Sequence, residues 1–442
     1  MSEGATDTAP SQRVLGLPAA VSLVVGSMIG SGVFLLPASL ARFGGVALLG
    51  WIVSALGATV LAVVFARLSR IDPAAGGPYA YTRHAFGDLA GFLIAWGYWI
   101  SIWTADAALS VAFVGYLSPF IPTIVAQPPL AAALAVATVW VLTIVNIRGV
   151  RTAGRVQVVT TVLKLLPLVA IAICGVLFFD ARHFAIADTS PRAVGQGLIA
   201  TTTLTMFALI GLEAATVPAT VVKDPDRTIP RATVIGTLIA AGIYILSTIG
   251  VMSLVEPASL MRSTAPFADA ARAVMGDRAA ALVALGASIS CFGALNGWIL
   301  IVGQLPVALV ADGLWPSAFG RMSRRGTPAF GMVVAAVLTT ALIAMNYSKS
   351  LVDLFTFIIL LATLAVLIPY AFCALAGLLI LGRRGERPSA REVTLALIAF
   401  VFSFAAIIGA GANTVFWGFM LLLAGLPVYV WVVRERVRGG RS

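Results

Sequence analysis

Five small residues interrupt the first long apolar run of the chain. The run extends from about residue 15 to residue 42, long enough to cross a membrane, and its middle holds Gly26, Ser27, Gly30, Ser31 and Gly32. Because glycine weakens a helix, and non-helical backbone at membrane depth must be buried in protein or line a polar cavity, the run predicts a broken helix. Its second half would begin near Gly30, with free N–H groups and a positive dipole end that can bind a carboxylate. Close helix packing through small residues is the alternative interpretation.

Three ionisable side chains lie inside other apolar runs, namely Asp106, Lys164 and Glu213. Placing each at membrane depth costs about 2.5–3.5 kcal/mol on insertion scales, so each needs a function or a partner. Glu213 lies just past Gly211, where a second apolar run is interrupted as the first one is at Gly30. The alternative is a structural role, through mutual pairing or, for Lys164, snorkelling to the membrane surface.

The elements that must position these residues are membrane-spanning helices. The 442 residues are 60% hydrophobic and 11% charged, and the mean hydropathy is +1.01, which no soluble fold can bury. The net charge of +11 comes from positive residues in short loops between apolar spans, so it does not indicate nucleic-acid binding. Cys174, Cys291 and Cys373 lie within apolar spans, which argues against disulfides and against a metal cluster.

Twelve apolar spans can be counted, and the positive residues predict their orientation. The spans lie at about 15–42, 44–68, 89–118, 129–148, 156–179, 194–221, 232–255, 279–311, 328–346, 351–381, 392–411 and 414–433. Most of the 29 Lys and Arg residues fall in one alternating set of segments between spans, and this set includes both terminal segments. Because Lys and Arg accumulate on the cytoplasmic side, we expect both termini in the cytoplasm.

An internal repeat relates two halves of the chain. A Pro-aromatic-Ala triplet followed by Gly-Asp occurs after span 2, at residues 78–88, and again after span 7, at residues 266–277. Five spans separate the copies, so the copies have opposite orientations in the membrane. Two inverted five-span repeats with broken first helices are typical of secondary transporters, whose site lies where spans 1 and 6 cross.

These patterns predict an all-α integral membrane protein of twelve helices, with a five-plus-five inverted repeat and broken helices 1 and 6. Its parts are a cytoplasmic tail at 1–12, the first repeat at 13–191, the second at 192–381, and helices 11 and 12 with a cytoplasmic C-terminus at 382–442. A channel, the remote alternative, would need a pore ring and no anion pocket. The sequence has no H-E-x-x-H, G-x-S-x-G or G-x-x-x-x-G-K-S/T pattern, so we expect no enzyme activity, cofactor, bound metal or ATP drive.

Several segments carry a family resemblance. GSMIGSGVFLLP, DPAAGGPYAYTRHAFGDLAG, TMFALIGLEAA with VVKDPDRTIPRAT, and NGWILIVGQLPVALVADGLWP resemble the amino acid–polyamine–organocation superfamily, and the likeness covers nearly the whole chain. Within the superfamily the chain is most similar to the bacterial arginine/agmatine antiporter and other basic amino acid/polyamine antiporters. The resemblance implies alternating access in a bacterial inner membrane, with amino acids or polyamines as substrates. Members often form homodimers, so a second copy of the chain is a candidate partner.

The resemblance also implies roles for individual residues. The substrate carboxylate would meet the start of the second half of span 1, the α-amino group would meet carbonyls in the break of span 6, and Phe207 would cover the substrate's side chain. The implied substrate-binding residues are Met28, Ile29, Gly30, Ser31, Gly32, Ser101, Asp106, Phe207, Ile210, Gly211 and Trp298, and the implied gating or coupling residues are Tyr98, Lys164, Glu213 and Tyr370.

Three departures from the antiporter leave the substrate open. Phe207 stands where the antiporter has a tryptophan, and it is a weaker cation–π partner. Lys164 occupies a position where broader amino-acid exchangers of the superfamily often carry a lysine, and Asp106 stands where asparagine is usual. Phe207 and Lys164 favour a neutral or broad-range exchanger, whereas Asp106 and Glu213 favour a cationic substrate or proton coupling. We expect a cationic amino acid or polyamine, with a neutral exchanger or a proton symporter as the alternative.

Overall fold

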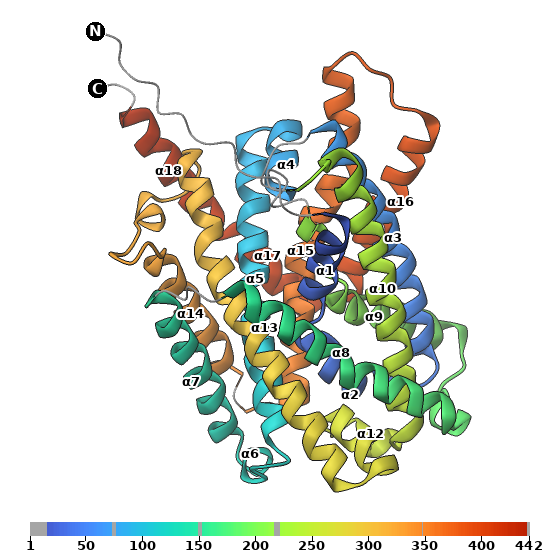
Figure 1. Cartoon of the computed structure of the whole chain (residues 1–442). Helices are drawn as coiled ribbons and strands as arrows, with labels where there is room; N and C mark the ends of the chain where they lie inside the picture. The colour runs from blue at the N-terminus through green and yellow to red at the C-terminus, as the bar shows by residue number, and fades with distance from the viewer. Residues whose placement is uncertain (1–15, 73–76, 149–152, 216–221, 347, 440–442) are drawn as a thin grey trace.

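The structure, a computed structural model, describes residues 16–72, 77–148, 153–215, 222–346 and 348–439. The regular structure of this part of the chain is helical (Figure 1). The α-helices are α1 (Leu17–Met28), α2 (Ser31–Leu40), α3 (Val46–Ile71), α4 (Pro78–Phe86), α5 (Asp88–Leu117), α6 (Thr123–Ala126), α7 (Pro128–Ile147), α8 (Ala153–Leu177), α9 (Pro191–Ala208), α10 (Pro225–Leu254), α11 (Pro257–Leu260), α12 (Pro266–Met275), α13 (Asp277–Ala311), α14 (Ala329–Ala344), α15 (Leu351–Arg383), α16 (Ala390–Gly409), α17 (Ala412–Leu423) and α18 (Gly425–Gly439). Short 3-10 turns, among them η3 (Leu212–Ala215), complete the described elements.

Eight helices of the described chain are long and apolar enough to cross a membrane. They are α3, α5, α7, α10, α13, α15, α16 and the continuous pair α17–α18. If the bent pair α1–α2 is counted as one span, the described chain has up to nine. The other three predicted spans coincide with α8, α9 and α14, which are helical but shorter or more polar over their described residues. The chain is therefore an all-helical membrane protein.

The first predicted break is present. α1 ends at Met28 and α2 begins at Ser31, so Ile29 and Gly30 belong to neither helix. The two helices are bent by 44° relative to each other. Gly30 has φ −131° and ψ −146°, and no side chain caps the start of α2. The small residues of this stretch therefore end one helix and start another, as the glycine content predicts.

The second predicted break follows α9. This helix ends at Ala208, and Gly211 then takes a φ of +103° before η3 begins. A side chain would be strained at that φ, so glycine is required there. The polar content of α9 comes from threonines whose hydroxyls bond back to carbonyls four residues earlier, such as Thr202 to Leu198.

α4 and α12 have matching local structure at opposite ends of the bundle (Figure 1). Each is followed by a glycine with positive φ, Gly87 at +92° and Gly276 at +80°, which precedes the first residue of the next long helix. Each also has an arginine whose Nε donates to the aspartate that begins that helix, at 2.9 Å from Arg83 to Asp88 and 2.9 Å from Arg272 to Asp277. The sequence repeat is thus accompanied by the same turn and the same ion pair.

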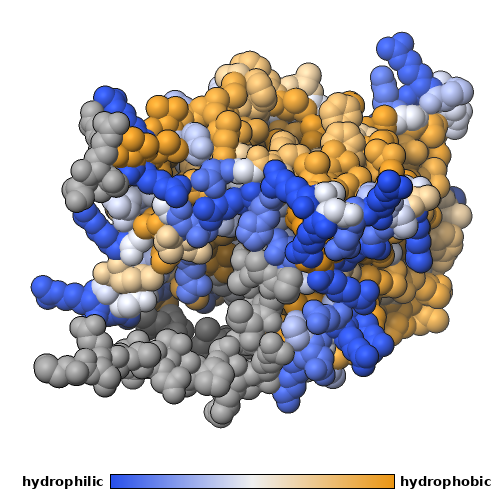
Figure 2. Space-filling view, turned by 90° about the horizontal axis from the view of Figure 1, so that it is seen from above, coloured by the Kyte–Doolittle hydropathy of each residue, from blue (hydrophilic) through white to orange (hydrophobic). Residues whose placement is uncertain are grey.

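The centre of the bundle is formed by α5 and α15. Within its most apolar window, α5 is 83% buried and α15 is 72% buried, whereas the window over α17 and α18 is only 17% buried. α5 packs on α15 and α13, and α3 packs on α9 and α10. Seen from the end that carries α4, hydrophilic residues cover much of the face, and hydrophobic residues form most of the visible flank (Figure 2).

Candidate functional site

The two helix breaks meet inside the bundle. The Ser27 hydroxyl, in the last turn of α1, donates to the Val24 carbonyl at 2.8 Å and to the Gly211 carbonyl at 3.2 Å. A Cβ on Gly211 would lie 3.1 Å from the Ser27 Oγ, so glycine is needed at 211 for close approach as well as for its φ. The Gly211 carbonyl, in the break after α9, therefore faces the end of α1.

A small cavity lies at this junction. Its volume is about 50 Å³, and its walls come from both breaks, from α5 and from α13. Six of the predicted site residues line it, together with four that the sequence did not single out for this role. The first group is Met28, Gly30, Gly32, Phe207, Ile210 and Trp298, and the second is Ser27, Ala105, Leu109 and Ala208.

α2 and α9 touch at backbone distance beside this cavity. A Cβ on Gly32 would lie 3.1 Å from the Ala208 Cα and 3.1 Å from Cδ1 of Phe207. The Phe207 ring packs edge-on against Phe355 of α15, with ring centroids 6.3 Å apart and planes at 88°. Gly32, in the first turn of α2, lines the cavity, and the N–H groups and dipole of this helix end favour an anion there.

A buried acid network lies just past the second break. The Glu213 side chain is fully buried in η3 and accepts a hydrogen bond from the Tyr98 hydroxyl of α5 at 2.8 Å. The Tyr370 hydroxyl of α15 donates to its other carboxylate oxygen. The network therefore joins the second break to both central helices.

The position of this network along the bundle follows from the helices that carry it. Tyr98 precedes Ala105 by seven residues on α5, which is about 10 Å toward the α4 end at 1.5 Å per residue. At the same end, Arg383 at the close of α15 donates to the His84 carbonyl of α4 at 2.5 Å. Glu213 and its tyrosines therefore lie between the cavity and the α4 end, whereas Phe355, near the start of α15, lies toward the other end.

Asp106 is buried but does not line the cavity. Its side chain is 2% exposed, and within the described chain no hydrogen-bond donor reaches its Oδ1. Its neighbours Ala105 and Leu109 are the α5 residues that face the cavity. A buried carboxylate oxygen without a partner is energetically costly, so Asp106 is poised to take up a cation or a proton.

The remaining predicted residues fall outside the cavity or outside the described side chains. Ile29 is fully buried within the break, and the Ser101 hydroxyl donates to the Tyr98 carbonyl within α5 at 2.7 Å; neither lines the cavity. The side chains of Ser31 and Lys164 lie outside the described residues, although α2 begins at Ser31 and Lys164 belongs to α8. Among described residues, no group of three or more His, Cys, Asp or Glu side chains could hold a metal ion.

Comparison with known proteins gives a consistent set of relatives. The family profile described as amino acid permease matches residues 15–432. The chain is 36% identical over 440 residues to the cadaverine/lysine antiporter of Escherichia coli K12, covering 96% of each chain. It is 31% identical over 424 residues to the putrescine transporter PotE of Haemophilus influenzae, covering 95% of this chain and 97% of that one. These relatives are transporters and not enzymes.

Proposed function

The chain belongs to the amino acid permease family, and we propose on that basis that it is a secondary active antiporter that exchanges a cationic amino acid for a polyamine. The observation that carries the proposal is the cavity shared by the two helix breaks, with a buried carboxylate on the neighbouring face of α5 whose Oδ1 meets no hydrogen-bond donor among the described residues. Lysine, cadaverine and putrescine, named for the relatives, are all organic cations with at least one terminal ammonium group.

We propose that the chain crosses the membrane twelve times and is built from two inverted five-helix repeats. The matching turns and ion pairs after α4 and α12 support this arrangement, as does the position of these helices at opposite ends of the bundle. The concentration of Lys and Arg in one set of loops supports placing the α4 end, and with it both termini, in the cytoplasm.

Within the cavity, each end of the substrate has a matching group. The carboxylate of lysine would bind the start of α2 at Ser31 and Gly32, and its α-amino group would bind carbonyls near Ile210 and Gly211. Phe207 offers a ring face to the aliphatic chain and its ammonium group. The cavity of about 50 Å³ is far smaller than such a substrate needs, so Phe207 and Trp298 must move apart when it binds.

Asp106 would select for positive charge. A charge-assisted bond from an ammonium group to a carboxylate in a low-dielectric cavity outweighs the neutral bond that asparagine could make. Asp106 lies about 80° around α5 from the face that Ala105 and Leu109 turn to the cavity, at about 100° per residue, so a rotation of α5 or an altered side-chain rotamer would be needed to bring the carboxylate to the substrate. Lys164 of α8 would place a fixed positive charge near the first break, where it can help to hold a carboxylate.

Two contacts would alternate as gates. The Glu213, Tyr98 and Tyr370 network closes the path toward the α4 end, and the edge contact of Phe207 with Phe355 narrows the path toward the other end. Opening one while the other stays closed would give alternating access. Glu213, which must stay paired with tyrosines or take up a proton when they separate, is the candidate for coupling transport to pH.

One observation favours a second candidate, a neutral or broad-range exchanger. The ten described residues that line the cavity are all uncharged, so among them an ammonium group would find no counter-ion unless Asp106 turns toward it. In this case Asp106 stays neutral and has a structural role.

Substrate binding to wild type and Asp106→Asn distinguishes the two candidates. In purified wild type, lysine, cadaverine and putrescine should each raise the melting temperature, and alanine and leucine should raise it little. In Asp106→Asn the response to the cations should fall much more than the response to alanine or leucine. A wild-type response to alanine and leucine alone would show that the neutral exchanger is correct.

A further inference from the structure

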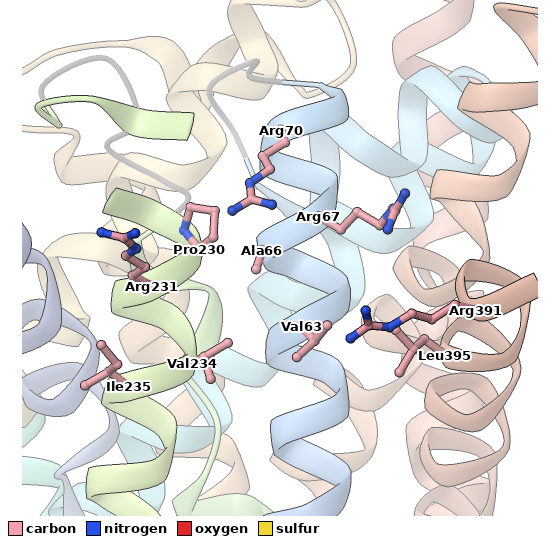
Figure 3. A pocket seen from close by; sticks show the side chains of 10 residues that line it. All are labelled: Val63, Ala66, Arg67, Arg70, Pro230, Arg231, Val234, Ile235, Arg391 and Leu395. Atoms are coloured by element: carbon pink, nitrogen blue, oxygen red, sulfur yellow. The ribbon is translucent and has the colours of Figure 1, made fainter. Parts of the chain in front are cut away.

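A groove lined by arginines runs over the outer face of α3, between α10 and α16, near the end of the bundle that carries α4. Its volume is about 420 Å³. Arg67 and Arg70 come from α3, Arg231 from α10 and Arg391 from α16. Figure 3 shows the side chains of the three helices around the groove, with the Arg391 guanidinium pointing toward α3. The groove and the substrate cavity have no lining residue in common.

Each of the three helices places an apolar residue one turn deeper than an arginine. The three pairs, each four residues apart, are Arg67 with Val63, Arg231 with Ile235, and Arg391 with Leu395. One helical turn is about 5.4 Å, so the groove has a positively charged upper part and an apolar lower part. A phospholipid in the membrane has the matching arrangement, with its charged phosphate nearer the surface and its apolar acyl chains deeper.

Most of the positive charge in the groove is not neutralised by the protein. Arg67 forms an ion pair with Glu392, whose other oxygen accepts the Ser389 N–H in a capping box. The Arg70 Nε donates to the backbone carbonyl of Asp226 at 2.9 Å, which leaves its charge in place. Over the described part of the chain, no acidic side chain forms a salt bridge with Arg70, Arg231 or Arg391.

We propose that this groove binds an anionic phospholipid. Arg70 and Arg391 would hold the phosphate, to which guanidinium groups bind well because they donate paired hydrogen bonds, and Arg231, whose side chain lies on the side of α10 away from α3, would add positive charge at the edge of the groove (Figure 3). The acyl chains would lie on the apolar residues below. Basic grooves between membrane helices on the cytoplasmic side suit anionic headgroups, whereas a choline headgroup would bring a further positive charge to the cluster.

The bound lipid would join three helices that are far apart in the sequence. α10 also packs on α1, so a lipid that fixes the ends of α3, α10 and α16 would stabilise the frame around the first helix break. We therefore expect anionic lipid to raise the thermal stability of the protein.

The test compares lipids with matched acyl chains. Purified full-length protein in a neutral detergent is heated with phosphatidylglycerol, with phosphatidylcholine, or with inorganic phosphate at equal ionic strength. Of the three additions, only phosphatidylglycerol should raise the melting temperature of the wild-type protein. In the Arg231→Gln/Arg391→Gln variant more than half of that rise should be lost. The control Arg324→Gln/Arg434→Gln, which removes two exposed arginines elsewhere, should keep it.

Each other outcome overturns the proposal. An equal rise with phosphatidylcholine would show that any lipid suffices, and an equal rise with inorganic phosphate would show a site for free anions. An equal loss in both variants would show an effect of net charge. If Arg231→Gln/Arg391→Gln cannot be purified, native mass spectrometry of wild type with equal amounts of both lipids decides the matter, because retained phosphatidylglycerol must exceed retained phosphatidylcholine.

Discussion

Replacing Gly32 by alanine tests whether contact between α2 and α9 shapes the substrate site. The new Cβ would lie 3.1 Å from the Ala208 Cα and 3.1 Å from the Phe207 ring, whereas ordinary contacts of this kind begin near 3.4 Å. One of these neighbours is backbone, so α2 and α9 must separate by at least 0.3 Å, the difference between 3.4 and 3.1 Å. Overpacking of this kind typically costs about 1–3 kcal/mol.

The cost should appear in substrate affinity. If α2 and α9 must close around the substrate, a loss of about 1–3 kcal/mol weakens binding roughly 5- to 150-fold. Alanine also favours helix by about 1 kcal/mol relative to glycine, but this gain applies to open and closed forms alike and does not restore the contact. The assay is the apparent KM for lysine uptake into proteoliposomes, together with the lysine-dependent rise in melting temperature.

Two other glycines provide controls. A Cβ on Gly30 would meet only Leu109, at 3.7 Å, so Gly30→Ala should have a smaller effect than Gly32→Ala. Among the described residues, nothing outside the adjacent turns of α10 lies within 4 Å of the Cβ position of Gly242, so Gly242→Ala should leave affinity unchanged. Wild-type affinity and stability in Gly32→Ala would refute the view that this contact forms the site.

Two further substitutions test the charged groups. Glu213→Gln keeps the size of the side chain but cannot exchange a proton, so the variant should insert normally and lose the pH dependence of exchange; a rate that still follows pH as in wild type would place the coupling group elsewhere. Lys164→Ala should impair lysine uptake but affect cadaverine uptake less, because cadaverine has no carboxylate for the ammonium group to hold. Equal losses for both substrates would contradict a carboxylate-binding role for Lys164.

The helix breaks could be predicted from the sequence because glycine has a local effect. Gly30 and Gly211 disrupt helices wherever those helices lie, and the structure interrupts both runs at these residues. The hydrogen bond from Ser27 to the Gly211 carbonyl could not be predicted, because it joins residues 184 apart and depends on how the two broken helices cross.

The face that α5 turns to the cavity could not be predicted either. Ala105 and Leu109 line the cavity, and Asp106 lies beside them. An amphipathic helix shows its inner face in its sequence, but α5 is buried on nearly all sides and has no polar stripe to set its rotation. The sequence therefore indicated that Asp106 lies at membrane depth, where burying its charge is costly, but not which face of α5 it occupies.

The arginine groove shows the same limit at the surface. The distribution of arginines along the sequence indicated which end of the bundle is positive. The four arginines of the groove come together only because α3 packs against α10 and α16. Only the assembled bundle brings Arg70 and Arg391 to one groove.

Counterflow in proteoliposomes tests the central claim most directly. Vesicles are loaded with unlabelled cadaverine, alanine or buffer alone, and uptake of labelled lysine from outside is followed at equal pH on both sides. The antiporter proposed here should accumulate lysine rapidly in cadaverine-loaded vesicles and only slowly in the other two. Equally fast lysine uptake into buffer-loaded vesicles, or exchange of alanine with no uptake of lysine, would contradict it.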